Sequence, residues 1–323
     1  MDDVRWFTET AHGALVVPRL RALGLSVAQH GDAPARIVVA MGNTVATAAW
    51  SFAAKHRCDV VQFIWDLPPW RLGEGRYDPV WSVRGVLVSV PRLGRRYAER
   101  VGMYSRLRYV AAHARELWLP SAATAADVEG QFGLRGELLH YCYDSDRFTP
   151  GPEDHSRETT PTLLSVSRLM PMKNHEAVIR AGHRLGMAVR IIGPGPLRDM
   201  LEQQAMSLGV RCSIDSGWLT DEQVVAAYRE ATVVVCPSRF EGMGICGLEA
   251  AGCGTPVAAS DISPHREFLG TVAQFFALDD DESLDRAIHA ALQALRPSAT
   301  DIALYSIDAA ARRFHARLME LLH

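Results

Sequence analysis

The sequence predicts an α/β protein made of two doubly wound, Rossmann-like domains that face each other across a cleft. The length of 323 residues suits two domains of roughly 150 residues each. Short apolar runs alternate with helix-like stretches along almost the whole chain, which is typical of parallel sheets built from βαβ units. Apolar residues make up 48% and charged residues 22% of the chain, the ordinary balance of a globular protein.

Eleven apolar runs read as strands, and helices fit the stretches between them. One such helix, around residues 197–209, ends at Gly209, which suits a helix cap. In the first half, strands are predicted at residues 4–9, 25–29, 36–41, 59–66, 116–120 and 137–142. In the second half they are predicted at residues 162–168, 188–193, 211–215, 232–238 and 255–260.

The polar segment 144–162 divides the two halves, because it is rich in Pro, Ser, Thr and charge and lacks apolar periodicity. The predicted domains are a first Rossmann-like domain at residues 1–145 and a second Rossmann-like domain at residues 146–305. The last segment, 306–323, is predicted to be a helix that packs back on the first domain. Nothing in the sequence decides the oligomeric state.

Bulk properties exclude several classes of protein. The net charge of −3 implies no general attraction to nucleic acid. No apolar run approaches the ~18 residues needed to span a bilayer, and the first ten residues lack the basic-then-apolar pattern of a secretion signal. Six cysteines without a C-x-x-C pair favour free thiols in a reducing cytosol over disulfides or a zinc site. The expected location is therefore the cytoplasm.

The stretch SRFEGMGICGLEAAGCGTPV, residues 238–257, carries the strongest chemical signal. It follows a predicted strand, and its two glycines, Gly242 and Gly244, let backbone amides approach a ligand at the start of the next helix. Those amides and the positive helix end make an anion site. Glu241 and Glu249 flank this site, and an anion between two carboxylates that accept hydroxyl hydrogen bonds fits a nucleotide sugar. Taken alone, Glu241 and Glu249 are better explained by an ordinary turn and an exposed helix face than by a ligand site.

Two upstream loops strengthen this interpretation. Arg168 and Lys173 follow the strand at 162–168, where two cations can hold a diphosphate and stabilise its charge as it leaves. The alternative is that both are surface residues. In IIGPGPL, residues 191–197, Gly193 and Gly195 allow a base to lie against the backbone.

In this order, SRL…KN, IIGPGP, SGWLTDEQVVAAY and CPSRFEGMGICGLEAAGCGTPVAASD resemble the nucleotide-binding domain of family 4 retaining glycosyltransferases, which have the GT-B fold. The resemblance is close over residues 137–280. It implies that Glu249 holds the donor ribose, that Glu241 contacts the transferred sugar, and that Arg168 and Lys173 bind the diphosphate. It also implies that the amides of Gly242, Met243, Gly244 and Ile245 lie near phosphate and sugar, and that Gly193, Gly195, Trp218 and Leu219 line the base.

The first domain matches the family less closely. HGALVVPRLRALGLSV resembles the family's glycine-rich loop, but His12 stands where a first glycine is usual and leaves only Gly13 for donor contact. FIWDLPP resembles a stretch of the family that ends in His-Asp. Here Trp65 replaces the histidine, while Asp66 remains and is implied to be a catalytic residue. Because that histidine often contacts the donor sugar, its replacement leaves the sugar geometry, and activity itself, undecided.

Two further features of the first domain concern the acceptor. Residues 65–81 combine three Trp, one Tyr and two Arg, so Trp65, Trp70 and Arg71 are acceptor-side candidates, since aromatic faces stack on sugars and arginines hold anions. A hydrophobic plug over the sheet end is the alternative. Residues 84–115 carry eight arginines against one acidic residue, which suits contact with anionic lipid on the cytoplasmic face of a membrane, a phosphorylated acceptor, or a solvated helix face.

The predicted function is a retaining, metal-independent transfer of a hexose-type sugar from a nucleotide-diphosphate donor to a hydroxyl of a glycan, lipid or small molecule. The resemblance implies no cofactor and no metal, and Asp144-Ser145-Asp146 is set aside as a metal motif because it lies in the linker. Two alternatives stay open: a nucleotide-sugar epimerase or hydrolase of the same fold, and a non-catalytic nucleotide-sugar-binding partner subunit. The sequence does not decide the donor base, the sugar or the acceptor.

Overall fold

A computed structural model describes residues 2–67, 91–151, 160–217, 219–270 and 272–323, without the side chains of residues 91–101. Contacts divide the chain into two compact units. The first comprises Met1–Cys142 and Ile307–His323, and the second comprises Tyr143–Ser306. The chain thus leaves the first unit three residues earlier than the predicted boundary at residue 145, and its last helix belongs to the first unit.

The first unit is built on a six-stranded parallel sheet with the order β2-β1-β3-β4-β5-β6. Its strands are β1 (Asp2–Phe7), β2 (Val27–Ala28), β3 (Ala35–Met41), β4 (Asp59–Phe63), β5 (Glu116–Leu119) and β6 (Glu137–Leu138). The central register pairs Val39 with both Trp6 and Val61. These apolar strands are buried on both faces, as expected where helices cover a parallel sheet on each side.

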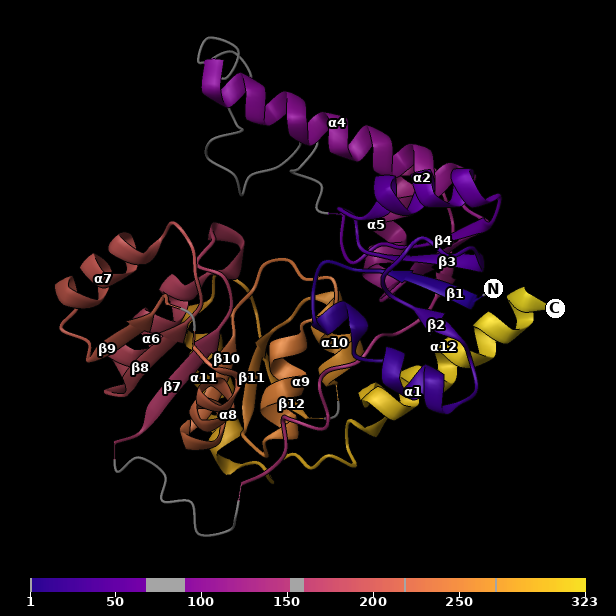
Figure 1. Cartoon of the computed structure of the whole chain (residues 1–323). Coiled ribbons are helices and arrows are strands. Elements are labelled where there is room, and N and C mark those ends of the chain that lie inside the picture. The colour runs from indigo at the N-terminus through magenta and orange to yellow at the C-terminus, as the bar shows by residue number, and fades with distance from the viewer. Residues whose placement is uncertain (1, 68–90, 152–159, 218, 271) are drawn as a thin grey trace. The chain divides into compact units, whose positions relative to one another are not determined.

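Helices cover both faces of this sheet (Figure 1). On one face lie α2 (Ala46–His56), α4 (Pro91–His113) and α5 (Ala122–Phe132), which share a core with Val38 and Val60. On the other face lie the short η1 (His12–Ala14), α1 (Val17–Ala22) and the C-terminal α12 (Ile307–Leu322). Phe314 of α12 is fully buried, and its ring lies 5.1 Å from that of Trp118 and 6.1 Å from those of Trp6 and Phe63, centroid to centroid.

The second unit is a second six-stranded parallel sheet, with the order β12-β11-β10-β7-β8-β9. Its strands are β7 (Thr162–Val166), β8 (Ala188–Ile192), β9 (Cys212–Asp215), β10 (Val233–Cys236), β11 (Val257–Ser260) and β12 (Ala273–Phe276). All eleven predicted strands are present, and the prediction of two doubly wound α/β sheets is confirmed. The edge strand β12 was missed.

Helices also cover both faces of the second sheet. One face carries α6 (His175–Leu185), α7 (Arg198–Ser207) and α11 (Asp281–Gln293), whose apolar sides form a core with Leu163, Ile191 and Val235. The other carries α8 (Asp221–Glu230), α9 (Ile245–Gly252) and α10 (Ser263–Leu269), while η3 (Pro171–Lys173) and η4 (Ala303–Tyr305) lie in connections. No helix in the described ranges is both long and apolar enough to cross a membrane.

Each sheet reverses its strand order at one place, and this place positions the candidate sites. In the second unit the reversal lies between β7 and β10, and in the first unit it lies between β1 and β3. In open α/β sheets, ligands bind beyond the carboxyl ends of the strands at such a reversal, because the two outgoing loops diverge there and leave a crevice. The loops that follow these four strands therefore form the candidate sites.

Candidate functional site

The reversal in the second unit brings together Lys173, which follows β7, and Glu241, which follows β10. Lys173 Nζ lies 2.5 Å from Glu241 Oε1, and the side chains are only 14% and 13% exposed. Ser238 Oγ donates a second hydrogen bond to the same oxygen at 2.6 Å. Burial by itself raises the pKa of Glu241, but the Lys173 ammonium outweighs it and holds that pKa below its usual value. The two residues form a mostly buried ion pair at the crevice.

Beside this pair, the backbone turns sharply into helix α9. Gly244 stands at the helix start with a φ of 72°, and a Cβ there would lie 2.7 Å from Cδ2 of His265. His265 of α10 is fully buried, and its Nδ1 lies 3.0 Å from the Ser260 carbonyl oxygen. Burial lowers the pKa of His265, so its imidazole is neutral near pH 7. Glycine is required here because the left-handed turn and the histidine ring leave no space for a side chain.

Glu249 lies on α9 and has a hydrogen-bond donor that the sequence did not suggest. The buried Tyr228 hydroxyl donates to Glu249 Oε2 at 2.8 Å. Burial raises the pKa of Glu249 to about 7, although the tyrosine hydrogen bond opposes this shift. One carboxyl oxygen is thus fixed by Tyr228, and the other is available to accept hydrogen bonds from a ligand.

The two glycines after β8 serve loop packing. Gly193 has a φ of 145°, and a Cβ there would lie 2.1 Å from the carbonyl oxygen of Ser167. Gly195 has a φ of 158°, and a Cβ there would lie 2.4 Å from the carbonyl oxygen of Leu169. The Leu169 N–H donates to the Pro194 carbonyl at 2.9 Å, which ties the two loops together. The backbones approach because neither residue has a side chain.

The remaining predicted donor residues lie around the same loops. Arg168 is exposed and, among the described residues, forms no hydrogen bond or ion pair through its side chain, so its guanidinium is available to an anion. Met243 is buried beneath the turn, and Ile245 is the first residue of α9. Gly242 and Leu219 are half-buried, while Trp218 lies outside the described residues.

In the first unit, Gly13 and Trp65 lie close to each other at the carboxyl edge of the sheet. The Gly13 carbonyl accepts a hydrogen bond from Trp6 Nε1 at 2.9 Å. The rings of His12 and Trp65 are 5.7 Å apart, and both also contact Tyr141. Asp66 is half-buried beside Trp65. The other acceptor-side candidates, Trp70 and Arg71, lie outside the described residues.

The arginine-rich segment 84–115 is only partly described. Residues 84–90 lie outside the described ranges, and most of the rest forms α4. On its last turns, Tyr104, Leu107 and Val110 are buried against the core, while Arg106 and Arg108 are exposed. These two arginines occupy a solvated helix face, and contact with a lipid surface stays a prediction.

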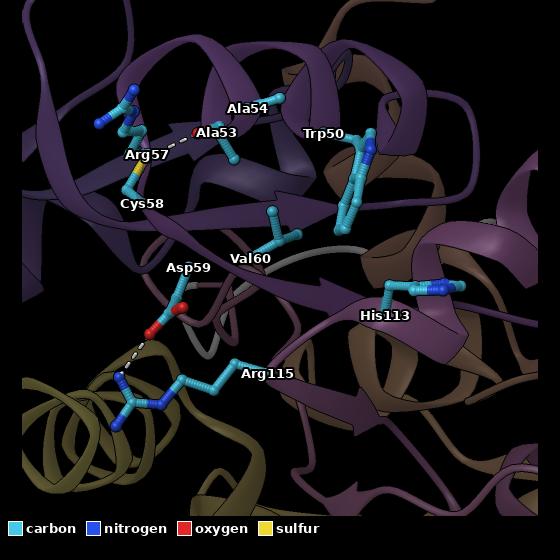
Figure 2. A pocket seen from close by; sticks show the side chains of 9 residues that line it. All are labelled: Trp50, Ala53, Ala54, Arg57, Cys58, Asp59, Val60, His113 and Arg115. Carbon is cyan, nitrogen blue, oxygen red and sulfur yellow. Dashed lines mark hydrogen bonds and ion pairs between the residues drawn. The ribbon is translucent and has the colours of Figure 1, made fainter.

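A hollow of about 560 Å³ lies at the amino end of β4 in the first sheet (Figure 2). Trp50 and His113 line one side, and the ion pair between Arg115 and Asp59, 2.8 Å long, crosses another. This hollow lies at the amino ends of the strands, away from the loops that carry His12 and Trp65. It therefore contributes nothing to a site at the strand reversals.

Sequence reasoning missed Tyr228, Ser238 and His265. A buried tyrosine normally needs a hydrogen-bond partner, which is a usable signal for Tyr228 once its helix face is known. Ser238 and His265 carry no signal in the sequence, because their importance depends on which strands are neighbours. Within the described residues no group of three or more His, Cys, Asp or Glu side chains could hold a metal ion.

Comparison with known proteins finds similarity to glycosyltransferases. Residues 151–300 match the family model "Glycosyl transferases group 1". The chain is 31% identical over 175 residues to a GDP-mannose-dependent alpha-(1-6)-phosphatidylinositol monomannoside mannosyltransferase of Mycolicibacterium smegmatis, covering 47% of this chain and 46% of the relative. It is 35% identical over 144 residues to the D-inositol 3-phosphate glycosyltransferase of the same organism, covering 40% and 32%. The matches thus span less than half the length of these curated relatives.

Solved structures resemble the whole chain in fold. Anabaena Alr3699/HepE in complex with UDP gives a TM-score of 0.65 at 14% identity, covering 100% of this chain and 97% of that one. WaaG, a glycosyltransferase involved in lipopolysaccharide biosynthesis, gives 0.61 at 17% identity, covering 98% and 95%. The chain has the α/β fold of GT-B glycosyltransferases, and its residues 151–300 are similar to the glycosyl transferases group 1, which is consistent with the family 4 resemblance.

Proposed function

We propose that the protein is a retaining, metal-independent glycosyltransferase that moves a hexose-type sugar from a nucleotide-diphosphate donor to a hydroxyl acceptor. The observation that carries the proposal is the buried pair of Lys173 and Glu241 at the glycine-rich start of α9. A cation, a helix start and a carboxylate then stand side by side at the strand reversal. This is the combination that a diphosphate joined to a sugar requires.

Each group has a role in this proposal. Lys173 and the exposed Arg168 bind the diphosphate and stabilise the charge that develops on it as the bond to the sugar breaks. The amides at the start of α9 bind the same anion. Glu241 accepts hydrogen bonds from hydroxyls of the sugar, and Glu249 accepts them from the ribose with the oxygen that Tyr228 leaves available. The departing phosphate oxygen takes the acceptor's proton on the face it leaves, so the anomeric configuration is kept.

The donor's base and sugar follow from a binding experiment. One relative is named as GDP-mannose-dependent and one similar structure contains UDP, so both nucleotides are suitable probes. We expect one of UDP and GDP to raise the thermal unfolding temperature clearly more than the other. A protein that responds to neither nucleotide contradicts the proposed donor site.

Turnover is tested with the matching nucleotide sugar and a panel of hydroxyl acceptors, with and without a chelator. We expect nucleotide diphosphate release that depends on acceptor and persists in the chelator, and a product whose anomeric proton coupling in NMR matches the donor's. An inverted product contradicts the retaining mechanism. Equally fast release without acceptor identifies a hydrolase, an altered sugar on the nucleotide identifies an epimerase, and nucleotide binding with no turnover for any acceptor identifies a non-catalytic partner.

The buried ion pair decides how the role of Lys173 must be tested. The variant Lys173→Ala is expected to lower turnover, but it also affects stability. Because Lys173 is the partner of the mostly buried Glu241, its removal leaves an unpaired carboxylate, which costs about 3 kcal/mol or more of stability. Its catalytic effect is therefore the difference in turnover between Glu241→Gln and the double variant, because neither of these leaves an unpaired carboxylate.

A further inference from the structure

Two cysteines of the second unit lie in contact at the two ends of one loop. Cys236 is the last residue of β10, and Cys246 is the second residue of α9. Residues 237–244 join them and form the β10–α9 loop. The two Sγ atoms lie 3.6 Å apart, within hydrogen-bond distance for a pair of thiols. Both thiols are free, and the proposed function gives neither of them a role.

A bond between these two sulfurs would close a ring around the β10–α9 loop. That loop carries Ser238, Glu241 and Gly244, which form the hydrogen bond, the ion pair and the sharp turn of the candidate site. Cys236 also interacts electrostatically with both Glu241 and Lys173. A chemical change at the two sulfurs therefore acts on both ends of the loop that forms the site.

The same sulfurs lie close to the other carboxylate of the site. Tyr228, whose hydroxyl donates to Glu249, interacts electrostatically with both Cys236 and Cys246. The thiol pair is thus in electrostatic contact with groups on both sides of the candidate site.

The two thiols differ in their access to a reagent. Cys236 is only 2% exposed, and it pairs with Ala259 of the neighbouring strand β11. The hydrogen bond with Cys246, together with burial, raises the pKa of Cys236 well above its usual value, so Cys236 stays protonated and does not react with an oxidant by itself. Cys246 is half-buried, so a small oxidant reaches its sulfur first.

We propose that Cys236 and Cys246 form a reversible disulfide that inactivates the candidate site when the protein meets a peroxide. Cys246 Sγ attacks one oxygen of hydrogen peroxide, the O–O bond breaks, and the other oxygen leaves as water with the thiol proton. Cys236 Sγ then displaces the hydroxyl from the resulting sulfenic acid, and that hydroxyl leaves as a second water with the proton of Cys236. The two thiols together lose two electrons, which reduce the peroxide. A dithiol reverses the reaction by exchange.

The effect on the site follows from the distance that the sulfurs must travel. An S–S bond is about 2.05 Å long, so two atoms 3.6 Å apart must approach each other by about 1.5 Å. Because β10 is held between β7 and β11, the movement falls on the start of α9 and on the loop before it. The amides at the helix start and Glu241 then leave their positions, and a misplacement of about 1 Å can cost about 100-fold in rate. This consequence for donor binding and turnover rests on the proposed function.

Alkylation shows whether the disulfide forms. The reduced full-length protein is treated with limiting hydrogen peroxide, denatured, alkylated with N-ethylmaleimide and measured by mass spectrometry. We expect all six cysteines to be alkylated before treatment and two fewer afterwards, with residues 236 and 246 joined in the peptide map. Full alkylation, a different pair, or sulfinic acid in place of the disulfide overturns the proposal.

Nucleotide binding shows whether the disulfide acts on the site. Binding of UDP and of GDP is measured by calorimetry on the reduced, the oxidised and the re-reduced protein. We expect oxidation to weaken the better nucleotide about tenfold or more, the loss of one hydrogen bond to a charged group, and dithiothreitol to restore it. A disulfide that leaves binding unchanged contradicts the inactivation. A reduced protein that binds neither nucleotide refutes the donor site together with its inactivation, whereas the alkylation result still decides whether the disulfide forms.

Cysteine variants separate this pair from the other thiols, and each is compared with itself before and after peroxide. Cys246→Ala and Cys236→Ala each remove one half of the pair, and we expect neither to form the disulfide and Cys246→Ala to keep its nucleotide affinity after treatment. Cys212→Ala is the matched control, because Cys212 is also half-buried in the second unit but lies on β9; it is expected to respond as wild type does. An equal loss of affinity in Cys246→Ala, or protection by Cys212→Ala, rules out the assignment.

Discussion

The raised pKa of Glu249 makes a quantitative prediction about stability and pH. Its carboxyl has a pKa of about 7 in the folded protein, against 4.5 as the ordinary value. The folded state therefore holds this proton more tightly than the unfolded state. Stability is highest below pH 4.5 as far as this group is concerned, and it falls as the pH rises from about 4.5 to about 7.

The size of the effect follows from the shift. A difference of about 2.5 pKa units corresponds to about 3.4 kcal/mol once ionisation is complete, and roughly 2.5 kcal/mol of it is lost between pH 5 and pH 8. This is an upper value, because Glu249 is only partly buried and solvent screens its charge. Glu249→Gln removes the ionisation and can still accept the Tyr228 hydrogen bond, so it isolates this contribution.

The assay is urea unfolding of wild type and Glu249→Gln at pH 5, 6, 7 and 8, with the difference in unfolding free energy taken at each pH so that other titrating groups cancel. We expect the variant to gain on wild type by about 1–2.5 kcal/mol across this range. Glu282→Gln, at an exposed position on α11, is the surface control and is expected to stay within about 0.5 kcal/mol. A difference that is flat, or that shrinks as the pH rises, refutes the reasoning.

Three further predictions concern packing and the ion pair. Lys173→Met should lower the free energy of unfolding by about 3 kcal/mol and turnover by at least about tenfold. Adding Glu241→Gln should restore the stability but not the turnover. Recovery of turnover in the double variant would contradict the role of Lys173. Gly193→Ala should lower the free energy of unfolding in urea by about 3 kcal/mol or more, because φ is positive and the new Cβ would clash with the Ser167 carbonyl oxygen. Gly186→Ala, at a φ of 64° in open space, should lower it by about 1 kcal/mol. Equal losses would show that the clash is relieved. Phe314→Ala should cost about 3–5 kcal/mol, measured in the same way, and a loss below 1 kcal/mol would show that α12 is not tightly packed.

Periodicity alone found most of the fold. Eleven of the twelve strands in the described residues were predicted, because buried parallel strands are short apolar runs bounded by turn residues. Strand β12 was missed because AQFF is short, half-exposed and without β-branched residues. Edge strands pack on one side only, so their sequences carry a weaker signal.

The candidate site was predicted residue by residue but not as a set of contacts. Lys173 and Glu241 were both placed near the donor, but the sequence assigned one to phosphate and the other to sugar, and nothing in it says that they pair. Their meeting depends on β7 and β10 being neighbours, which is a property of strand order. The glycines at 193 and 195 were expected to make room for a base, which stays a prediction; the structure adds that they make room for another loop.

The return of α12 to the first unit has a consequence for synthesis. The strand residues Trp6, Phe63 and Trp118 emerge from the ribosome well before Phe314, the residue that covers them. Until then, a face of aromatic side chains lacks its cover while the whole second unit is being made. Nascent chains with such exposed apolar faces are prone to aggregation. We therefore expect the nascent first unit to depend on chaperones until α12 has been synthesised. We also expect chains truncated before residue 307 to be found in the insoluble fraction.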